Sequence, residues 1–190
     1  MISDDYRAYG MNVFRLVRGL FTGHTFFLLM SQRIGNWMYR HHIPFFPDVI
    51  KFWQLKRFSC ELSPYATIGE GLLIQHSAGI VVGHEVVMGH SCELFQNVTI
   101  GSNRKLNNGR YMPILGNHVT VYAGAVVVGG IQIGNHVTIG ANSFVNKDIP
   151  DYAIVVGNPA RIVSYHDKDG EASETNISIK QDDASSTSSL

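Results

Sequence analysis

An apolar residue recurs at every sixth position over two long stretches of this chain, and this spacing constrains the fold more than any other feature. The positions are Leu62, Ile68, Ile74, Ile80, Val86, Cys92 and Val98, and then Leu115, Val121, Val127, Ile133, Ile139 and Val145. A period of six fits neither the 3.6-residue turn of a helix nor the two-residue alternation of a simple strand. It is typical of a solenoid with three short flat faces per coil, in which three such steps complete one turn.

Two near-copies of one segment support a coil of eighteen residues. The segments Leu115-Gly-Asn-His-Val-Thr and Ile133-Gly-Asn-His-Val-Thr lie eighteen positions apart. They contain His118 and His136, which we expect to stack one coil apart on an outer face. The residues between the apolar positions are rich in Val, Ile and Thr, as parallel strands that are buried on their inner face require. The sequence therefore predicts a mainly-β solenoid.

The repeat occupies only the middle of the 190-residue chain. Residues 1–58 lack the six-residue spacing and look helical, so we expect them to cover the open end of the solenoid and to pack against a partner subunit. Docking of this aromatic-rich region to a membrane surface is the alternative. Residues 59–165 form the predicted solenoid domain. Residues 166–190 are rich in Ser, Asp, Glu and Lys, and we expect disorder there because they can bury little apolar surface.

The regular spacing is interrupted once within the solenoid. Val98 and Leu115 are seventeen residues apart, which is not a multiple of six. The intervening residues 102–113 are polar, basic and rich in turn-forming residues, so we expect an external loop. Loops on a rigid scaffold commonly carry function, although a solvated spacer would have the same composition.

Charge and composition exclude several classes of protein. The net charge is zero, which gives no reason to expect nucleic-acid binding. The acidic start of the chain lacks the basic residues of a signal peptide, and the apolar stretch 19–32 is too short to span a bilayer. Cys60 and Cys92 lack the spacing of metal ligands. We therefore expect a soluble, cytoplasmic protein whose membrane contact is at most peripheral.

His76 is the strongest candidate for chemistry. It follows the apolar corner residue Ile74, so its ring should lie outside the packed interior. Glu61 lies fifteen residues earlier, close to one coil, and could accept a hydrogen bond from one ring nitrogen and leave the other as a base. A surface histidine without a role is the alternative. His84 and His90 are on neighbouring faces and are poor co-ligands for one ion, so no metal is expected.

Three segments resemble the serine acetyltransferase family of hexapeptide-repeat acyltransferases. They are residues 61–83, which include Ile74-Gln-His-Ser-Ala-Gly, then Gln96-Asn-Val-Thr-Ile-Gly, and the ending Val156-Gly-Asn-Pro-Ala-Arg-Ile-Val. The resemblance covers about 61–163. It implies a left-handed parallel β-helix, which is an exception to the right-handed crossover rule. It also implies acetyl-CoA as the donor, and a homotrimer with active sites between subunits; pairing of trimers into hexamers is left open.

The resemblance also assigns roles by position. It makes His76 the general base and places Glu61 where the family has an aspartate that orients this histidine. Arg161 would lie near the adenine and phosphates of the coenzyme, where a permanently charged guanidinium is suitable. The residues along the pantetheine arm would be Ser102, Ala123, Gly124 and Ala141.

Two departures from the family pattern concern the acceptor. Gln75 stands where the family has an aspartate before the histidine, and Tyr111-Met112 replaces an Arg-His pair that contacts serine. These losses remove about 1.5–3 kcal/mol for each charged hydrogen bond to an amino acid. Arg110 could still contact a carboxylate, but no residue replaces the lost acid. Gln75 and Tyr111 can instead hydrogen-bond hydroxyl groups, and Tyr111 can stack on a sugar ring.

The sequence therefore predicts an acetyl-CoA-dependent O-acetyltransferase that acts on a sugar hydroxyl, in surface polysaccharide biosynthesis. The main alternative is a serine O-acetyltransferase of cysteine biosynthesis. A non-catalytic β-helix scaffold and a metal-dependent hydratase are the remaining alternatives.

Overall fold

The computed structural model describes residues 2–10, 25–107 and 109–167. The helices of this part are α1 (Ile2–Ala8), α3 (Thr25–Arg40) and α4 (Phe46–Phe58). The strands are β1 (Glu61–Leu62), β2 (Thr67–Ile68), β3 (Leu73–Ile74), β4 (Val81–Val82), β5 (Val87–Met88), β6 (Glu93–Leu94), β7 (Thr99–Gly101), β8 (Ile114–Leu115), β9 (Thr120–Val121), β10 (Val126–Val128), β11 (Gln132–Ile133), β12 (Thr138–Ile139), β13 (Phe144–Val145), β14 (Ala153–Val156) and β15 (Arg161–Tyr165).

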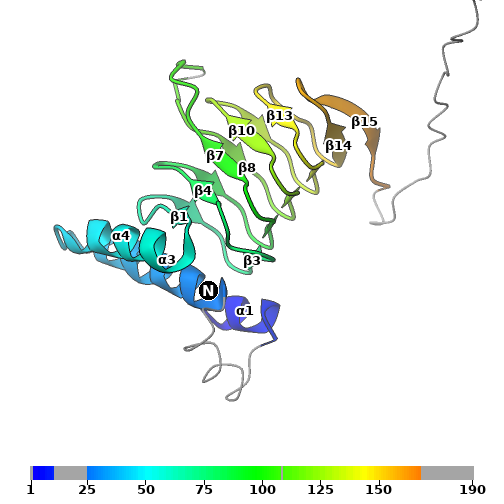
Figure 1. The fold of residues 1–190 in the computed structure, drawn as a ribbon. Helices are drawn as coiled ribbons and strands as arrows, with labels where there is room; N and C mark the ends of the chain where they lie inside the picture. Colours follow the sequence, from blue (N-terminus) through cyan, green and yellow to red (C-terminus); the bar gives the residue numbers. More distant parts are fainter. Residues whose placement is uncertain (1, 11–24, 108, 168–190) are drawn as a thin grey trace, which may run out of the picture.

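The strands form three sheets, which are the three faces of a prism (Figure 1). Sheet A has the order β1-β4-β7-β10-β13, sheet B the order β2-β5-β8-β11, and sheet C the order β3-β6-β9-β12-β14-β15. Each coil contributes one strand to each sheet, and neighbouring strands are parallel except for the antiparallel pair β14–β15. The chain is therefore a mainly-β, left-handed parallel β-helix with short N-terminal helices, as predicted.

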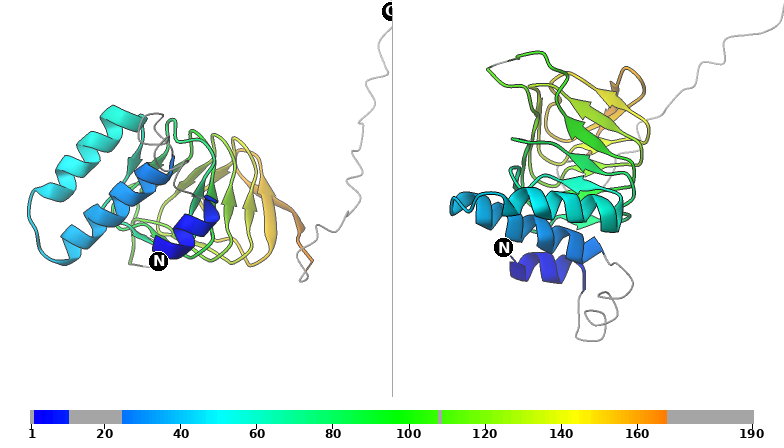
Figure 2. Two further views of the ribbon diagram at one scale, coloured as in Figure 1. Left: turned by 90° about the horizontal axis from the view of Figure 1, so that it is seen from below. Right: turned by 60° about the vertical axis from the view of Figure 1, so that its left-hand side comes forward.

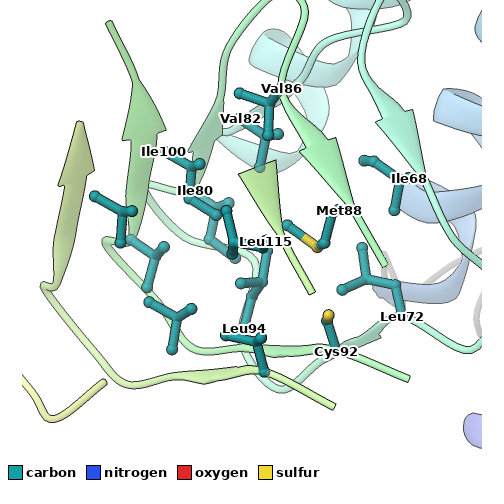
Figure 3. Packing of buried hydrophobic residues seen from close by; sticks show 14 of the residues in the cluster. Ile68, Leu72, Ile80, Val82, Val86, Met88, Cys92, Leu94, Ile100 and Leu115 are labelled. Carbon is teal, nitrogen blue, oxygen red and sulfur yellow. The ribbon is translucent and has the colours of Figure 1, made fainter. Parts of the chain in front are cut away.

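The interior of the prism is made of the residues that the six-residue spacing selects. None of the thirteen is more than 6% exposed. Figure 3 shows several of them, with their neighbours, pointing into the space between the sheets. Burial of apolar side chains stabilises such a core by roughly 25 cal/mol for each Å² removed from water.

The first coil is longer than the sequence predicts. Glu61 pairs with Val81, an offset of 81 − 61 = 20, whereas Val81 pairs with Thr99 at the expected 18. The two additional residues lie in the turn 75–80 between β3 and β4. The spacing conceals them because each coil step has two inward positions, one in the strand and one just before it. Ile74 occupies the first kind of position and Ile80 the second, and both are buried.

A larger irregularity follows β7. Val87 pairs with Ile114, an offset of 114 − 87 = 27, so this coil has nine residues more than the regular 18. The additional residues lie within 102–113, between β7 and β8. The Asn107 amide Nδ2 donates to the Gly130 carbonyl over 3.1 Å and ties this loop to the next coil. A long loop is compatible with the solenoid because loop-closure entropy grows slowly with loop length.

Helices α3 and α4 lie side by side across the end of the prism that begins with β1 (Figure 2). Gly35 of α3 allows this close approach, because a Cβ there would lie 2.9 Å from Cβ of Pro64. Ser59 caps the C-terminus of α4. Its N–H donates to the Leu55 carbonyl, and its left-handed φ of 53° turns the chain out of the helix.

Polar side chains from the N-terminal region, Tyr9 just after α1 and Gln54 in α4, satisfy backbone groups along the open edge of the first coil. Oη of Tyr9 accepts the N–H of Ile74 in β3 over 2.7 Å, and Oε1 of Gln54 accepts the N–H of Leu62 in β1 over 2.9 Å. Tyr9 and Gln54 are both buried. The helical region therefore closes a strand edge that would otherwise be open to pairing with another chain.

Two expectations lie partly beyond the described residues. The first is the helical region 1–58, of which residues 1 and 11–24 lie outside the described part. The second is the disordered tail, of which the structure describes only the first two positions. Among the described helices, none has the length and apolar content needed to cross a bilayer. The cytoplasmic location stays a prediction.

Candidate active site

Three edges join the sheets of the prism, and the candidate residues lie on two of them. Edge C–A consists of the turns 75–80, 95–98, 122–125 and 140–143, which lead from sheet C to sheet A. Edge A–B consists of the turns 63–66, 83–86, 102–113 and 129–131. Edge B–C consists of the turns 69–72, 89–92, 116–119 and 134–137. Each edge is a column of turns that is stacked by the parallel strand pairs on either side.

His76 lies on edge C–A and is exposed. The positions that stack above it in the next coils are Gln96, Ala123 and Ala141, because β3 pairs with β6, β6 with β9 and β9 with β12. The turn that carries His76 has six residues, 75–80, and the later turns on this edge have four. The predicted base and three of the predicted coenzyme residues, Ala123, Gly124 and Ala141, therefore share one edge.

In the coils that follow His76, edge C–A carries only small side chains at Ala123, Gly124 and Ala141, so the backbone there is not covered by large side chains. The Gly124 N–H donates to the Gln96 carbonyl over 3.0 Å, and the Asn142 N–H donates to the Ala123 carbonyl over 2.9 Å. Gly124 has a φ of +72°, and a Cβ there would lie 2.3 Å from Oδ1 of Asn142. A glycine is therefore required, and the small side chains at 123 and 141 leave room for a ligand to approach the backbone.

Arg161 lies at the far end of the same edge. It follows the turn Gly157–Ala160, which connects β14 to β15 and is hydrogen-bonded to Phe144 at both of its ends. The guanidinium is exposed, and Nη1 donates to the Ala160 carbonyl over 3.0 Å. Among the described residues, its other donors make no hydrogen bond.

Three predicted residues lie on a different edge. Ser102 begins the loop of edge A–B, and its Oγ accepts the N–H of Arg104 over 2.9 Å. Arg110 and Tyr111 lie later in the same loop and line a pocket of about 170 Å³ together with Glu85. Sheet A separates this edge from His76, so one chain does not bring the two groups of predicted residues together.

Glu61 lies beside the turn of His76, since its register partner Val81 directly follows that turn. Its carboxylate Oε1, however, is 2.8 Å from Nζ of Lys51 in α4. Within the described residues, no hydrogen bond or ion pair joins Glu61 to His76. The orienting role of Glu61 therefore stays a prediction, and in the single chain its partner is a lysine that only the tertiary packing of α4 brings near.

Gln75 precedes His76 on edge C–A, and its Nε2 donates to Oε1 of Glu93 in β6. Reasoning from the sequence missed Glu93. The regular coil length gave no signal for this contact, because the register partner of Glu93 is Leu73, at an offset of 93 − 73 = 20, and Gln75 reaches Glu93 diagonally. The half-buried carboxylate of Glu93 therefore lies next to the residue that precedes the candidate base.

Three of the other histidines, His90, His118 and His136, form a separate column on edge B–C. The rings of His118 and His136 stack with centroids 4.6 Å apart, which confirms the prediction, and the column continues to Tyr152 on one side and His90 on the other. Partial burial lowers the pKa of His118, and the neighbouring His136 and His90 lower it further. His84 lies on edge A–B, where it stacks on a tyrosine ring. Among the described residues, no cluster of three or more side chains is arranged to hold a metal ion.

Comparison with known proteins gives consistent matches. Residues 112–147 match the model of the family described as bacterial transferase hexapeptide (six repeats). The chain is 38% identical over 135 residues to a serine acetyltransferase of Synechococcus elongatus, which covers 71% of this chain and 55% of that relative. The chain thus spans about half the length of this curated relative.

Two solved structures extend the similarity to three dimensions. Soybean serine acetyltransferase, an apoenzyme, superposes with a TM-score of 0.76 at 30% identity, over 85% of this chain and 67% of that chain. A serine acetyltransferase in complex with CoA superposes with a TM-score of 0.68 at 32% identity, over 73% of this chain and 57% of that chain.

Proposed function

Because this chain belongs to the hexapeptide-repeat O-acetyltransferases of the serine acetyltransferase type, we propose that it transfers an acetyl group from acetyl-CoA to a hydroxyl group. One observation carries this proposal: His76 lies on the same edge as Ala123, Gly124 and Ala141, where small side chains leave the backbone open to a ligand. In the proposed site His76 is the base, and the backbone at these three residues contacts acetyl-CoA. The complex of a similar protein with CoA supports the choice of donor.

The mechanism follows from the exposed imidazole. His76 accepts the proton of the acceptor hydroxyl while the hydroxyl oxygen attacks the thioester carbonyl. Backbone N–H groups of the edge C–A turns stabilise the oxyanion that develops on the carbonyl oxygen. The carbon–sulfur bond then breaks, and the imidazolium returns its proton to the departing thiolate of CoA. Glu61 would stabilise the imidazolium once it exchanges Lys51 for the ring as its partner.

The site requires more than one subunit. His76 lies on edge C–A and Tyr111 on edge A–B, so one chain cannot place both on the same substrate. We infer a homotrimer in which edge C–A of one subunit faces edge A–B of its neighbour. Ser102, Arg110 and Tyr111 would then approach the donor and acceptor from the adjacent subunit. Pairing of trimers into hexamers stays open.

The similarity to known proteins changes which of the two candidate acceptors, a sugar or L-serine, we propose first. The sequence alone favours a sugar hydroxyl in polysaccharide biosynthesis, but the similar proteins are named serine acetyltransferases, and we therefore propose L-serine as the first acceptor to test. A sugar is the second candidate, because Gln75 and Tyr111 are uncharged groups that can hydrogen-bond hydroxyls.

An acetyl-transfer assay with mass-spectrometric detection tests both acceptors at once. The full chain is incubated with acetyl-CoA and, in separate reactions, with L-serine, with simple hexoses and with nucleotide sugars. We expect O-acetylserine as the main product. Acetylation of a sugar with serine left unchanged would overturn the serine assignment and keep the reaction class. Absence of transfer to every acceptor, with no acetyl-CoA binding by calorimetry, would overturn the reaction class itself.

A further inference from the structure

We propose that Glu93 provides a binding site for the ammonium group of an amino acid acceptor, and that Gln75 holds its carboxylate in place. The inference rests on the proposed acetyl transfer and names the charge that selects the acceptor. It supplies the acid that the sequence alone lacks at position 75.

The position of Glu93 brings a carboxylate to the candidate base from the neighbouring coil. Glu93 begins β6, and Leu73 of β3 is its register partner. Gln75 lies two residues beyond that partner, and its Nε2 reaches back to donate a hydrogen bond to Oε1 of Glu93. His76 is the next residue along the chain. A ligand that contacts the Glu93 carboxylate is thereby placed beside the turn that carries the imidazole.

The charge of Glu93 is not neutralised by any side chain in the described part of the chain. In the part of the chain that the structure describes, neither a lysine nor an arginine forms an ion pair with it, whereas Glu61 has Lys51. Gln75 donates a hydrogen bond but brings no positive charge, and the second oxygen of Glu93 has no hydrogen-bond donor among the described residues. A half-buried carboxylate in this state can form a strong charge-assisted hydrogen bond to an ammonium group.

The surroundings leave space for a ligand. Glu93 lines one end of a groove of about 510 Å³ between α1 and sheet C. Asp4, Arg7 and Glu70 also line this groove, whereas Gln75 and His76 lie outside its lining. The carboxylate is therefore accessible from solvent while one of its oxygens is fixed by Gln75. An uncharged sugar would gain little from this arrangement, because it cannot compensate the negative charge. The site thus favours an amino acid over a neutral polyol.

The test compares two acceptors that differ only in the ammonium group. L-serine and 3-hydroxypropanoate share the hydroxyl and the carboxylate, and only serine carries the ammonium. We expect the wild-type enzyme to prefer L-serine. Glu93→Gln should lower kcat/KM for L-serine by about 10- to 100-fold, mainly through KM, which is the loss of one charged hydrogen bond. The kcat/KM for 3-hydroxypropanoate and the KM for acetyl-CoA should stay nearly unchanged.

Two further variants make the result specific. Asp148→Asn removes the same charge far from His76, where its amide oxygen can still accept the N–H of Gln132, and it should leave both acceptors unaffected. Gln75→Glu combined with Glu93→Gln moves the carboxylate across the hydrogen bond and should restore a large part of the preference for serine.

The outcomes separate this inference from the proposed function. Equal losses for both acceptors, or no loss in Glu93→Gln, would overturn the role of Glu93 while serine acetylation stands. Failure of the wild-type enzyme to acetylate serine, with transfer to a sugar, would overturn the choice of acceptor and the ammonium site together. A circular dichroism spectrum matching the wild type accompanies each variant as the check of folding.

Discussion

Arg33 of α3 and Asp5 of α1 form a buried ion pair that joins these two helices beside the first coil of the prism. Nε of Arg33 is 2.9 Å from Oδ2 of Asp5, and Asp5 is fully buried. The guanidinium also donates to the carbonyls of Ile68 and Gly69, and Asp5 accepts the N–H of Gly71. Both charges thus satisfy backbone groups on edge B–C in addition to one another, as a buried pair must.

Removal of one partner should be costly. In Arg33→Met, Asp5 loses its counter-ion in a dry site and two carbonyls lose their donor, so we expect the free energy of unfolding to fall by about 3–5 kcal/mol. Urea denaturation followed by circular dichroism measures it. Arg7→Met is the matched control, because the Arg7–Asp4 pair is exposed and 3.8 Å long and should contribute at most about 1 kcal/mol. Similar small losses in both variants would contradict a structural role for the buried pair.

The phenol of Tyr9 is predicted to stabilise the edge of sheet C. Tyr9→Phe removes the acceptor of the Ile74 N–H and should lower the free energy of unfolding by about 1–3 kcal/mol, because the amide is left buried and unpaired. Burial raises the pKa of Tyr9 to about 12, so the hydroxyl stays protonated throughout the measurement. Tyr6→Phe is the control, because Tyr6 lies on α1 shortly before Tyr9 and is exposed, and it should change stability by less than about 0.5 kcal/mol.

The residues of the prism interior could be predicted from the sequence, because every side chain that points inward must be apolar. The length of the first coil could not be predicted. Ile74 and Ile80 are six apart and both buried, although they occupy different kinds of inward position. The two additional residues lie in an exposed polar turn, where packing places no demand on residue type. The sequence therefore locates His76 on its edge but does not show that its turn is enlarged.

The six-residue spacing could not predict contacts that depend on how the helices pack on the solenoid. Lys51 meets Glu61 only because α4 lies across the first coil, and nothing in the solenoid spacing specifies where that helix lies. The Gln75–Glu93 contact was also beyond the pattern. The first coil sets Glu93 in register with Leu73, an offset of 93 − 73 = 20, so the side chain of Gln75 reaches Glu93 diagonally and not through an eighteen-residue spacing.

Acid should destabilise the fold in part through the histidine column. The pKa of His118 is lowered in the folded state, whereas the unfolded chain titrates at the ordinary value of about 6.5. As the pH falls through that value, the unfolded state binds a proton that the folded state resists, so stability falls. We expect the Tm of the wild type to drop further than that of His118→Asn between about pH 8 and about pH 5.5.

Asparagine suits this position because it tolerates the left-handed φ of 56°. His42→Asn is the control, since His42 is also exposed and left-handed, with a φ of 55°, but lies outside the column. Parallel pH profiles of the wild type and His118→Asn would show that the column does not contribute.

We expect the loop of edge A–B, residues 102–113, to be dispensable for folding but required for binding the acceptor. Deletion of residues 103–111 removes nine residues and returns the coil to the regular offset of 18 that Val81 and Thr99 show. We expect cooperative thermal unfolding and unchanged acetyl-CoA binding by calorimetry, with a KM for the acceptor raised at least about tenfold through loss of Arg110 and Tyr111. Loss of cooperative unfolding would instead assign the loop a structural role.

Replacement of the candidate base tests the chemistry most directly. In His76→Ala no side chain on edge C–A can take the proton of the acceptor hydroxyl, so kcat should fall by about two to four orders of magnitude. The donor surface at Ala123, Gly124 and Ala141 is untouched, and acetyl-CoA should bind as in the wild type. Stopped assays of O-acetyl product and calorimetry measure the two quantities separately.

His41→Ala is the control, because His41 is an exposed histidine between α3 and α4. It lies on none of the three edges, so its replacement should leave both quantities unchanged. Turnover that survives in His76→Ala would move the base to another residue, and a parallel loss of donor affinity would show that the imidazole contacts the donor rather than activating the acceptor.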